Sequence, residues 1–399
     1  CLIIEKEDHF VGLCKSFKVG DSIFDYSGHF MHFNDKNIEE YVKCLTTKHA
    51  TGSFEEYSRR ACIAMTTGEN ILNYVVDYPF QANIHQLDKQ EFIRCLTDLW
   101  NASLTQKKAE TFEDLVRQTF GNSITNLFFR PYNEKLYCTD LASIDADGMK
   151  RFIPKVSFSE VVNNFSYKTS FGYNSTFLYS PSSGIQGLCD AFLKERPVTS
   201  SVKETVLEID TAQKTVKTDK RSIKYETLIN TLPLTTFAKL AHKNDLNLKS
   251  VDVHVYNITY EGRVSVLRNY CWIYVPDPKI IFYRVGFYDF MSKSPNTSIY
   301  VEVSTKTGTD TCSTLLDIDK KLKEYGFIFP NAVIKDSLQL KISPAYAILE
   351  KNTESIVSEY RKELQKQDVH LTGRYGRWAY QSIEDNIRDS KELALLLSI

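Results

Sequence analysis

Cys1-Leu-Ile-Ile-Glu5 opens the chain and leads into Lys-Glu-Asp-His-Phe-Val-Gly-Leu-Cys14. The apolar run that ends in Glu5 predicts a short buried strand. In folds that bind a dinucleotide, the acid at the end of the second strand hydrogen-bonds the ribose hydroxyls. An acid after a strand is also common elsewhere, so Glu5 alone is equally well explained as a solvated strand-end carboxylate. The sequence that follows must decide between these interpretations.

A second segment, Asp25-Tyr-Ser-Gly-His-Phe-Met-His-Phe33, favours the cofactor-binding interpretation of Glu5. Together the two segments resemble the region after the second strand in the flavoproteins that include UDP-galactopyranose mutases, protoporphyrinogen oxidases and amine oxidases. The mutase branch is the most similar, with an acid-Lys, a glycine pair and, later, Gly-x-His-x-x-His. The resemblance implies that this part of the chain runs beside the isoalloxazine ring and ribityl chain of FAD. Glycine allows the backbone to approach such a flat ring.

The first motif is matched in part. Glu5 and Lys6 supply the acid-Lys, Gly12 keeps one glycine of the pair, and Val11 replaces the other. The resemblance makes Glu5, Lys6, Gly12 and the adjacent Leu13 candidate FAD contacts. Val11 is a departure that would loosen or shift those contacts.

The second motif keeps both histidines. Ser27 stands at the family's glycine, Gly28 fills the next place, and His29 and His32 match. Gly28 and His29 are therefore further candidate FAD contacts. A histidine pair at i and i+3 without carboxylate or cysteine partners is poor evidence for a metal site, so we expect packing near the cofactor.

The family's Gly-x-Gly-x-x-Gly loop should lie roughly twenty residues before Glu5, where its amides would hold the pyrophosphate. The sequence given begins at Cys1, so we expect this loop and the first β-α unit to be missing from it. A chain that truly started at Cys1 would bind FAD poorly.

The middle of the chain resembles the substrate half of the mutases. Phe129-Arg-Pro-Tyr-Asn-Glu-Lys-Leu-Tyr137 is similar to a motif ending in Glu-Lys-x-Trp, whose aromatic residue lines the nucleotide-sugar pocket, and Tyr137 takes the place of Trp. Arg151 falls roughly where the mutases carry a pocket arginine, and Arg284 resembles a second one that meets the substrate diphosphate. Planar guanidinium groups match diphosphate oxygens bidentately. Each arginine alone is equally an ordinary surface charge.

Two further positions have two explanations each. Tyr346, in Ser-Pro-Ala-Tyr-Ala-Ile, corresponds either to a pocket tyrosine of the family or to a core tyrosine. Val206 stands where the family's adenine-contacting strand residue would lie, and a plain buried strand valine explains it equally well.

The end of the chain gives a stronger signal, Leu371-Thr-Gly-Arg-Tyr-Gly-Arg-Trp-Ala-Tyr-Gln-Ser-Ile-Glu-Asp385. It resembles the family's closing flavin motif, in which a helix starts under the isoalloxazine and would stabilise negative charge on reduced flavin. A terminal helix capped by Ser382, with acids in its first turn, explains the same residues structurally. Ser382 also stands where the mutases usually have Asp, which counts against strict mutase activity. The matched positions are Gly373, Arg374, Ser382 and Ile383 for the cofactor and Tyr380 for the substrate.

The order of elements predicts an α/β fold with an FAD-binding Rossmann-like domain of the GR2 type, an inserted helical domain and an antiparallel-sheet substrate domain. Helical patterns run from Ile38 to Ala64, from Lys89 to Leu104 and from Thr111 to Phe128, with Thr111 as N-cap. We expect the domains to comprise 1–35, 180–245 and 366–399 (FAD-binding), 36–130 (helical), and 131–179 and 246–365 (substrate).

Composition limits the compartment and the partners. The 399 residues carry 49 basic and 50 acidic side chains, which excludes a general nucleic-acid binder. Nine scattered cysteines without a CxxC pair fit reduced thiols and no metal site. There is no apolar run of membrane-spanning length and no signal peptide. We expect a cytoplasmic protein that acts on a small molecule, a nucleotide sugar by the resemblance, and that is compatible with a homo-oligomer.

Three functions remain open. A UDP-galactopyranose-mutase-like enzyme would use reduced flavin as covalent catalyst, with Arg151 and Arg284 holding the diphosphate and Tyr137, Tyr346 and Tyr380 shaping the sugar site. No catalytic side chain is assigned. An oxidoreductase of the amine or protoporphyrinogen oxidase type would instead pass a hydride to the flavin. A truncated or degenerate relative would hold no cofactor.

Overall fold

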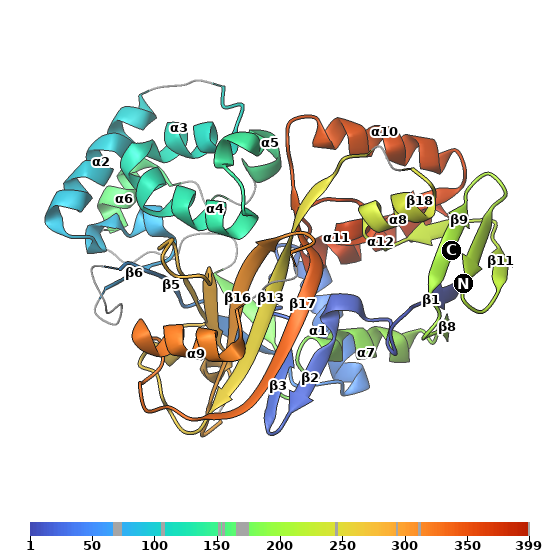
Figure 1. Cartoon of the computed structure of the whole chain (residues 1–399), viewed down its shortest axis with the longest axis horizontal. Helices are drawn as coiled ribbons and strands as arrows, with labels where there is room; N and C mark the ends of the chain where they lie inside the picture. Colours follow the sequence, from blue (N-terminus) through green and yellow to red (C-terminus); the bar gives the residue numbers. More distant parts are fainter. Residues whose placement is uncertain are drawn as a thin grey trace.

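The computed structural model describes residues 1–66, 74–104, 108–150, 153, 156–164, 175–243, 246–292, 294–309 and 313–397. It is a mixed α/β fold, as the sequence predicts. Figure 1 shows a group of helices on one side, a long twisted sheet in the middle, and a third region that holds both chain ends. No helix in the described ranges has both the length and the apolar character needed to cross a membrane.

A seven-stranded sheet forms the middle of the molecule. Its neighbouring strands are antiparallel, except for β14 and β5, which run parallel. One face is covered by α9 (Leu315–Glu324) through its buried Ile318 and Leu322, and the other face packs in the larger core with the helical group. In order across the sheet, the strands are β17 (Ile334–Ile348), β13 (Lys249–Tyr260), β16 (Thr297–Lys306), β15 (Arg284–Phe287), β14 (Trp272–Tyr274), β5 (Ala61–Ala64) and β6 (Val75–Asp77).

The helical group owes its shape to a bend in its longest stretch. Thr111 caps α3, as the sequence predicts, and forms a capping box with Asp114. Gly121 has φ 83°, and a Cβ there would lie 2.6 Å from the Asp98 Cβ of α2, so glycine lets the two helices approach. A π-helical turn, η4 (Thr125–Phe129), then leads into α4. The helices are α2 (Lys89–Ser103), α3 (Phe112–Ile124), α4 (Arg130–Tyr137), α5 (Ala146–Met149) and α6 (Phe158–Asn164).

Two parallel strand pairs join distant parts of the chain in the third region. β1 (Leu2–Ile4) pairs with β8 (Thr199–Ser201), and β12 (Leu228–Asn230) pairs with β18 (Val369–Leu371). Ligands of open α/β sheets bind beyond the carboxyl ends of such strands. The remaining elements are α1 (Lys36–His49), β2 (Ser16–Val19), β3 (Ser22–Asp25), β4 (Glu55–Ser58), β7 (Thr176–Tyr179), α7 (Gln186–Glu195), β9 (Val206–Asp210), β10 (Thr215–Thr218), β11 (Ser222–Lys224), α8 (Leu234–Leu240), α10 (Thr353–Gln365), α11 (Gly373–Gly376) and α12 (Ile383–Leu396).

The helix expected from Ile38 to Ala64 is wrong beyond its first half. α1 ends at His49, because Ala50 adopts the left-handed conformation (φ 48°), and the chain then forms β4 and β5. These strands pair with β7 and β14, which lie far along the sequence. α1 packs on α7 and α12 in the region of the chain ends. The helical stretch of η4 and α4 continues through residue 130, where we expected the helical domain to end.

A buried carboxyl group joins the β2–β3 hairpin to the start of α7. Asp25 is fully buried, and its Oδ1 accepts hydrogen bonds from the Ser16 hydroxyl at 2.5 Å and the Ile185 N–H at 3.3 Å. Burial disfavours the charged form and raises the pKa of Asp25 to about 7.

Asp25 is therefore expected to make the protein more stable in mild acid. Because the pKa of Asp25 is higher in the folded than in the unfolded chain, this contribution is fully present below its unfolded value and is lost as pH rises through about 7. Between pH 8 and pH 5.5, wild type should gain about 2 kcal/mol of unfolding free energy relative to Asp25→Asn. Urea unfolding of both proteins at the two pH values measures this gain. The same pH dependence in both proteins would show that Asp25 is not the titrating group.

Candidate functional site

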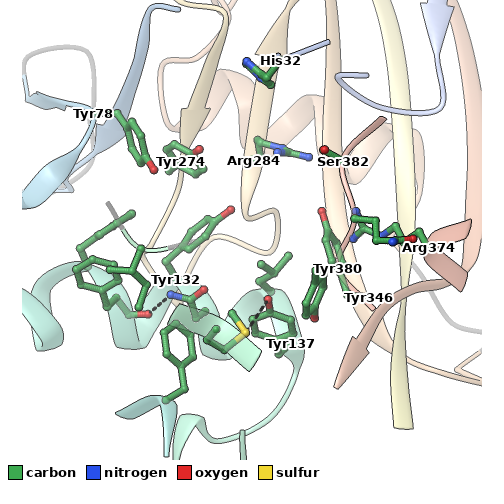
Figure 2. A pocket seen from close by; sticks show the side chains of 18 of the residues that line it. His32, Tyr78, Tyr132, Tyr137, Tyr274, Arg284, Tyr346, Arg374, Tyr380 and Ser382 are labelled. Carbon is green, nitrogen blue, oxygen red and sulfur yellow. Dashed lines mark hydrogen bonds between the residues drawn. The ribbon is translucent and has the colours of Figure 1, made fainter. Parts of the chain in front are cut away.

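A cavity of about 360 Å³ lies where the helical group, the seven-stranded sheet and the last part of the chain meet. Its wall is largely aromatic, with arginine and histidine side chains among the tyrosines and phenylalanines. In Figure 2, Tyr78 and Tyr274 lie on one side, Tyr346, Tyr380 and Arg374 on the other, and Arg284 is directed into the space between them. A tyrosine-rich pocket with a few charged groups is suited to a flat, polar ligand.

The helical side of the cavity comes from η4 and α4. Phe129, Tyr132 and Leu136 follow one another at helical spacing, so they project from the same face. The Tyr132 ring meets the Tyr274 ring of β14 edge to face, with 5.1 Å between the centroids. A π-helical turn leads into α4, and such turns are frequent at functional sites.

Three tyrosines predicted for substrate binding come together around Arg374. The ring centroids of Tyr137 and Tyr346 are 6.2 Å apart, and Tyr380 lies 6.4 Å from each of them. The Arg374 guanidinium lies over the rings of Tyr346 and Tyr380, at 5.3 and 5.4 Å from their centroids. Burial raises the pKa of Tyr137 to about 12, so its hydroxyl stays protonated at neutral pH. These residues come from α4, β17 and the segment before α12, which the sequence alone could not place together.

Arg284 lines the cavity as an already paired cation. Its Nε and Nη2 both donate to the carboxylate of Glu302, the Nη2 bond being 2.8 Å long, and Nη2 also reaches the Ser27 hydroxyl at 3.3 Å. The Glu302 side chain is only 2% exposed and the Arg284 side chain 20% exposed. Glu302 was not predicted as a site residue, although an acid within the apolar run of β16 was a signal for it.

A second buried carboxylate joins the closing motif to the segment that follows the histidine motif. Glu384, in the first turn of α12, accepts hydrogen bonds from the backbone N–H groups of Asn34 at 2.5 Å and Asp35 at 3.3 Å. Ser382 caps α12, as the sequence predicts, and forms a capping box with Asp385. The segment that follows the histidine motif is therefore fixed beside the start of the last helix. Sequence reasoning had given Glu384 only a place in the first helical turn.

The histidine motif itself lies close to Arg374. Burial, followed by the nearby Arg374 charge, lowers the pKa of His29 to about 4, so its ring is neutral. His29 Nδ1 is buried without a hydrogen-bond partner among the described residues. A Cβ at Gly28 would lie 2.8 Å from the Cζ of Tyr300, so this glycine makes room for a protein ring in the structure. His32 lines the cavity, and its Nδ1 lies 2.9 Å from the Thr176 carbonyl.

The candidate FAD contacts of the first motif lie around the end of β1. Glu5 accepts a hydrogen bond from the Glu7 N–H at 2.9 Å, and Lys6 is exposed. Gly12 has φ 56° with open space where a Cβ would stand, and Leu13 packs against the main core. Backbone hydrogen bonds from Glu5 N–H to Ser201 and from Glu204 N–H to Glu5 hold this strand end against β8.

Some of the remaining predicted site residues line the cavity, and others lie outside it. Val206 lies in the β11-β10-β9 sheet, Gly373 begins α11 with φ 77°, and Ile383 packs against the cluster around Met31. Arg151 lies outside the described residues. Among the described residues, Arg374 and Ser382 are the predicted cofactor contacts that line the cavity.

No protein-family model matches the sequence. A crystal structure of reduced UDP-galactopyranose mutase superimposes with a TM-score of 0.87 at 20% sequence identity, over 99% of this chain and 88% of that one. The chain has the fold of UDP-galactopyranose mutase.

Two other solved structures share the fold at a greater distance. A candidate protoporphyrinogen oxidase from Exiguobacterium superimposes with a TM-score of 0.71 at 12% identity, over 98% of this chain and 92% of that one. A putrescine oxidase variant gives a TM-score of 0.62 at 11% identity with the same coverage of both chains. These neighbours confirm the predicted mutase-like fold.

Proposed function

We propose that this protein is an FAD-dependent enzyme that acts on a nucleotide sugar in the manner of a UDP-galactopyranose mutase. One observation carries the proposal. The segment after β3 and the start of α12 are joined by Glu384 beside a cavity that also holds Arg284 and Arg374. The mutase-like fold supports it independently.

The residues present fit a flat, anionic cofactor. Glu5 and Gly373 follow the carboxyl ends of the parallel strands β1 and β18, where such folds bind dinucleotides. Arg374 and the amino-terminal end of α12 place positive charge at the cavity, and the neutral His29 ring offers an unpartnered buried nitrogen. Bound reduced flavin would supply the nucleophile that replaces UDP at the anomeric carbon of the sugar.

The chain's own residues would bind and orient the nucleotide sugar. Arg284 would hold the diphosphate, helped by Arg151 of the matched motif, because a guanidinium group binds phosphate oxygens in a fixed plane. Tyr137, Tyr346 and Tyr380 would exclude water from the sugar, and a tyrosine hydroxyl can donate a hydrogen bond to it. The aromatic wall from Tyr132 to Tyr274 would accept a flat ring such as the base.

A second candidate function is a flavin-dependent oxidoreductase of the amine or protoporphyrinogen oxidase type. Ser382 stands where the mutases usually have Asp, and Glu302 already neutralises much of the Arg284 charge. Less positive charge is then left for a diphosphate, and an apolar or amine substrate would suit the aromatic wall better.

The two functions are separated by one set of assays on the full chain reconstituted with FAD. A mutase should interconvert the pyranose and furanose forms of UDP-galactose only after dithionite reduction, with no oxygen consumed. Tyr346→Phe should lower the turnover about tenfold, because a hydroxyl at the sugar is lost. Conversion that needs no reductant would contradict the proposal. Substrate-dependent flavin bleaching with oxygen uptake would select the oxidoreductase, and absence of flavin binding by a protein that carries the Gly-x-Gly-x-x-Gly loop would remove both.

A further inference from the structure

Two cysteine thiols from distant parts of the sequence share a hydrogen bond in the region of the chain ends. Cys14 ends the short 3₁₀ turn η1 (Gly12–Cys14), and Cys189 lies on α7. Both residues are partly exposed at the surface. From this geometry we propose that Cys14 and Cys189 are a modification site, at which hydrogen peroxide closes the pair into a disulfide.

The backbone around the pair holds the two sulfur atoms in place. The Ser16 N–H donates to the Gln186 side-chain carbonyl at 3.1 Å, and the Gln186 N–H donates to the Ser16 hydroxyl at 3.1 Å. Gln186 and Cys189 are three residues apart on α7, so they share one face of the helix. The reciprocal bonds therefore fix the segment after Cys14 against the face that carries Cys189.

The shared hydrogen bond gives the two sulfurs different roles. It lowers the pKa of Cys14, whose thiolate it stabilises, and raises the pKa of Cys189. The thiolate is the nucleophile in cysteine oxidation. Cys14 therefore reacts first, and Cys189 acts as the resolving thiol.

The chemistry balances with peroxide as the only co-reactant. The Cys14 thiolate attacks one peroxide oxygen, the O–O bond breaks, and hydroxide leaves to become water after taking a proton, which gives a sulfenic acid. The Cys189 sulfur then attacks the Cys14 sulfur, and the hydroxyl leaves with the Cys189 proton as a second water. Two thiols are oxidised by two electrons in all, and one peroxide is reduced to two waters.

Other described cysteines lack this setting. Burial raises the pKa of Cys95 and Cys271 to about 12, which keeps their thiols protonated. Cys44 is exposed, so it serves as a control for oxidation that depends on solvent exposure alone.

The disulfide would act on the neighbouring candidate cofactor segment. Cys14 directly follows Gly12 and Leu13, so a bond to α7 would fix η1 in one position. This effect on cofactor retention rests on the proposed function, whereas formation of the bond does not.

The test uses the full chain treated with one to five equivalents of hydrogen peroxide, followed by N-ethylmaleimide and mass spectrometry of non-reduced peptides. We expect a Cys14–Cys189 cross-linked peptide that dithiothreitol releases, at least tenfold more abundant than any other disulfide. Cys44→Ser should leave it unchanged. In Cys189→Ser the cross-link should vanish, and Cys14 should be trapped by dimedone as the sulfenic acid.

Three results would overturn the proposal: Cys14 alkylated as completely after peroxide as before, Cys14 over-oxidised in wild type without the cross-link, or a preferred bond to another cysteine. FAD retention before and after oxidation is measured separately. A cross-link that forms in a protein without flavin binding would leave the redox pair intact and remove only its link to the cofactor.

Discussion

Arg284→Met is expected to destabilise the protein by about 3–5 kcal/mol, because it leaves the carboxylate of Glu302 buried without its partner. The Glu302 side chain is 2% exposed, and its carboxylate accepts hydrogen bonds from two guanidinium nitrogens of Arg284. The same substitution should weaken UDP binding about 10- to 100-fold, the size of a lost charge-assisted hydrogen bond. Urea unfolding measures the first effect and titration calorimetry with UDP the second.

The double variant Arg284→Met/Glu302→Met separates the two roles of this arginine. Replacing a buried ion pair by apolar residues of similar volume is often neutral, so stability should return to within about 1 kcal/mol of wild type while UDP binding stays weak. If the double variant is as unstable as the single one, the buried charge is not the cause of the loss. Wild-type UDP affinity in the double variant would exclude Arg284 from the substrate site.

Gly286→Ala is the second substitution with a large expected effect, a loss of about 3 kcal/mol of unfolding free energy. Gly286 lies directly opposite Tyr300 in the register of β15 and β16, and a Cβ on it would stand far inside van der Waals contact with the Tyr300 ring. Tyr300 is 1% exposed and also packs against Gly28, so its ring has no free space to move into. The midpoint of urea unfolding gives the measurement.

Two further variants serve as controls for Gly286→Ala. Gly262→Ala, at a position with open space and φ 70°, should lose only about 1 kcal/mol from backbone strain. In a Tyr300→Ala background, Gly286→Ala should cost little, because the obstructing ring is gone. Equal losses in both backgrounds would mean that Tyr300 is not the obstacle.

The sequence predicted local features better than long-range ones. The N-caps at Thr111 and Ser382 were readable because an N-cap depends only on residues of the first helical turn. The strands after His49 were missed because the signal that ends α1 is a left-handed Ala50, a residue that rarely adopts that conformation, and because β4 and β5 find their partners elsewhere in the chain. Local periodicity carries no information about those partners.

The same limit applied to the candidate site. Motifs on three separate segments pointed to Tyr137, Tyr346 and Tyr380, and the fold brings their rings together. Glu302 and Tyr274 gained their importance only from strand register and packing, which place Glu302 opposite Arg284 and Tyr274 against Tyr132. A single sequence does not encode such pairings in a form that spacing rules can read.

The parallel strand pairs β1–β8 and β12–β18 also determine when the protein can fold during its synthesis. Each pair joins strands whose positions in the sequence are far apart, and Tyr380, Ser382 and Glu384 come from the final stretch. On the ribosome, β1 must wait for β8, and the cavity wall cannot close before the start of α12 has been synthesised. Such high contact order slows folding, so the aromatic residues of the cavity wall remain exposed on the nascent chain until that point.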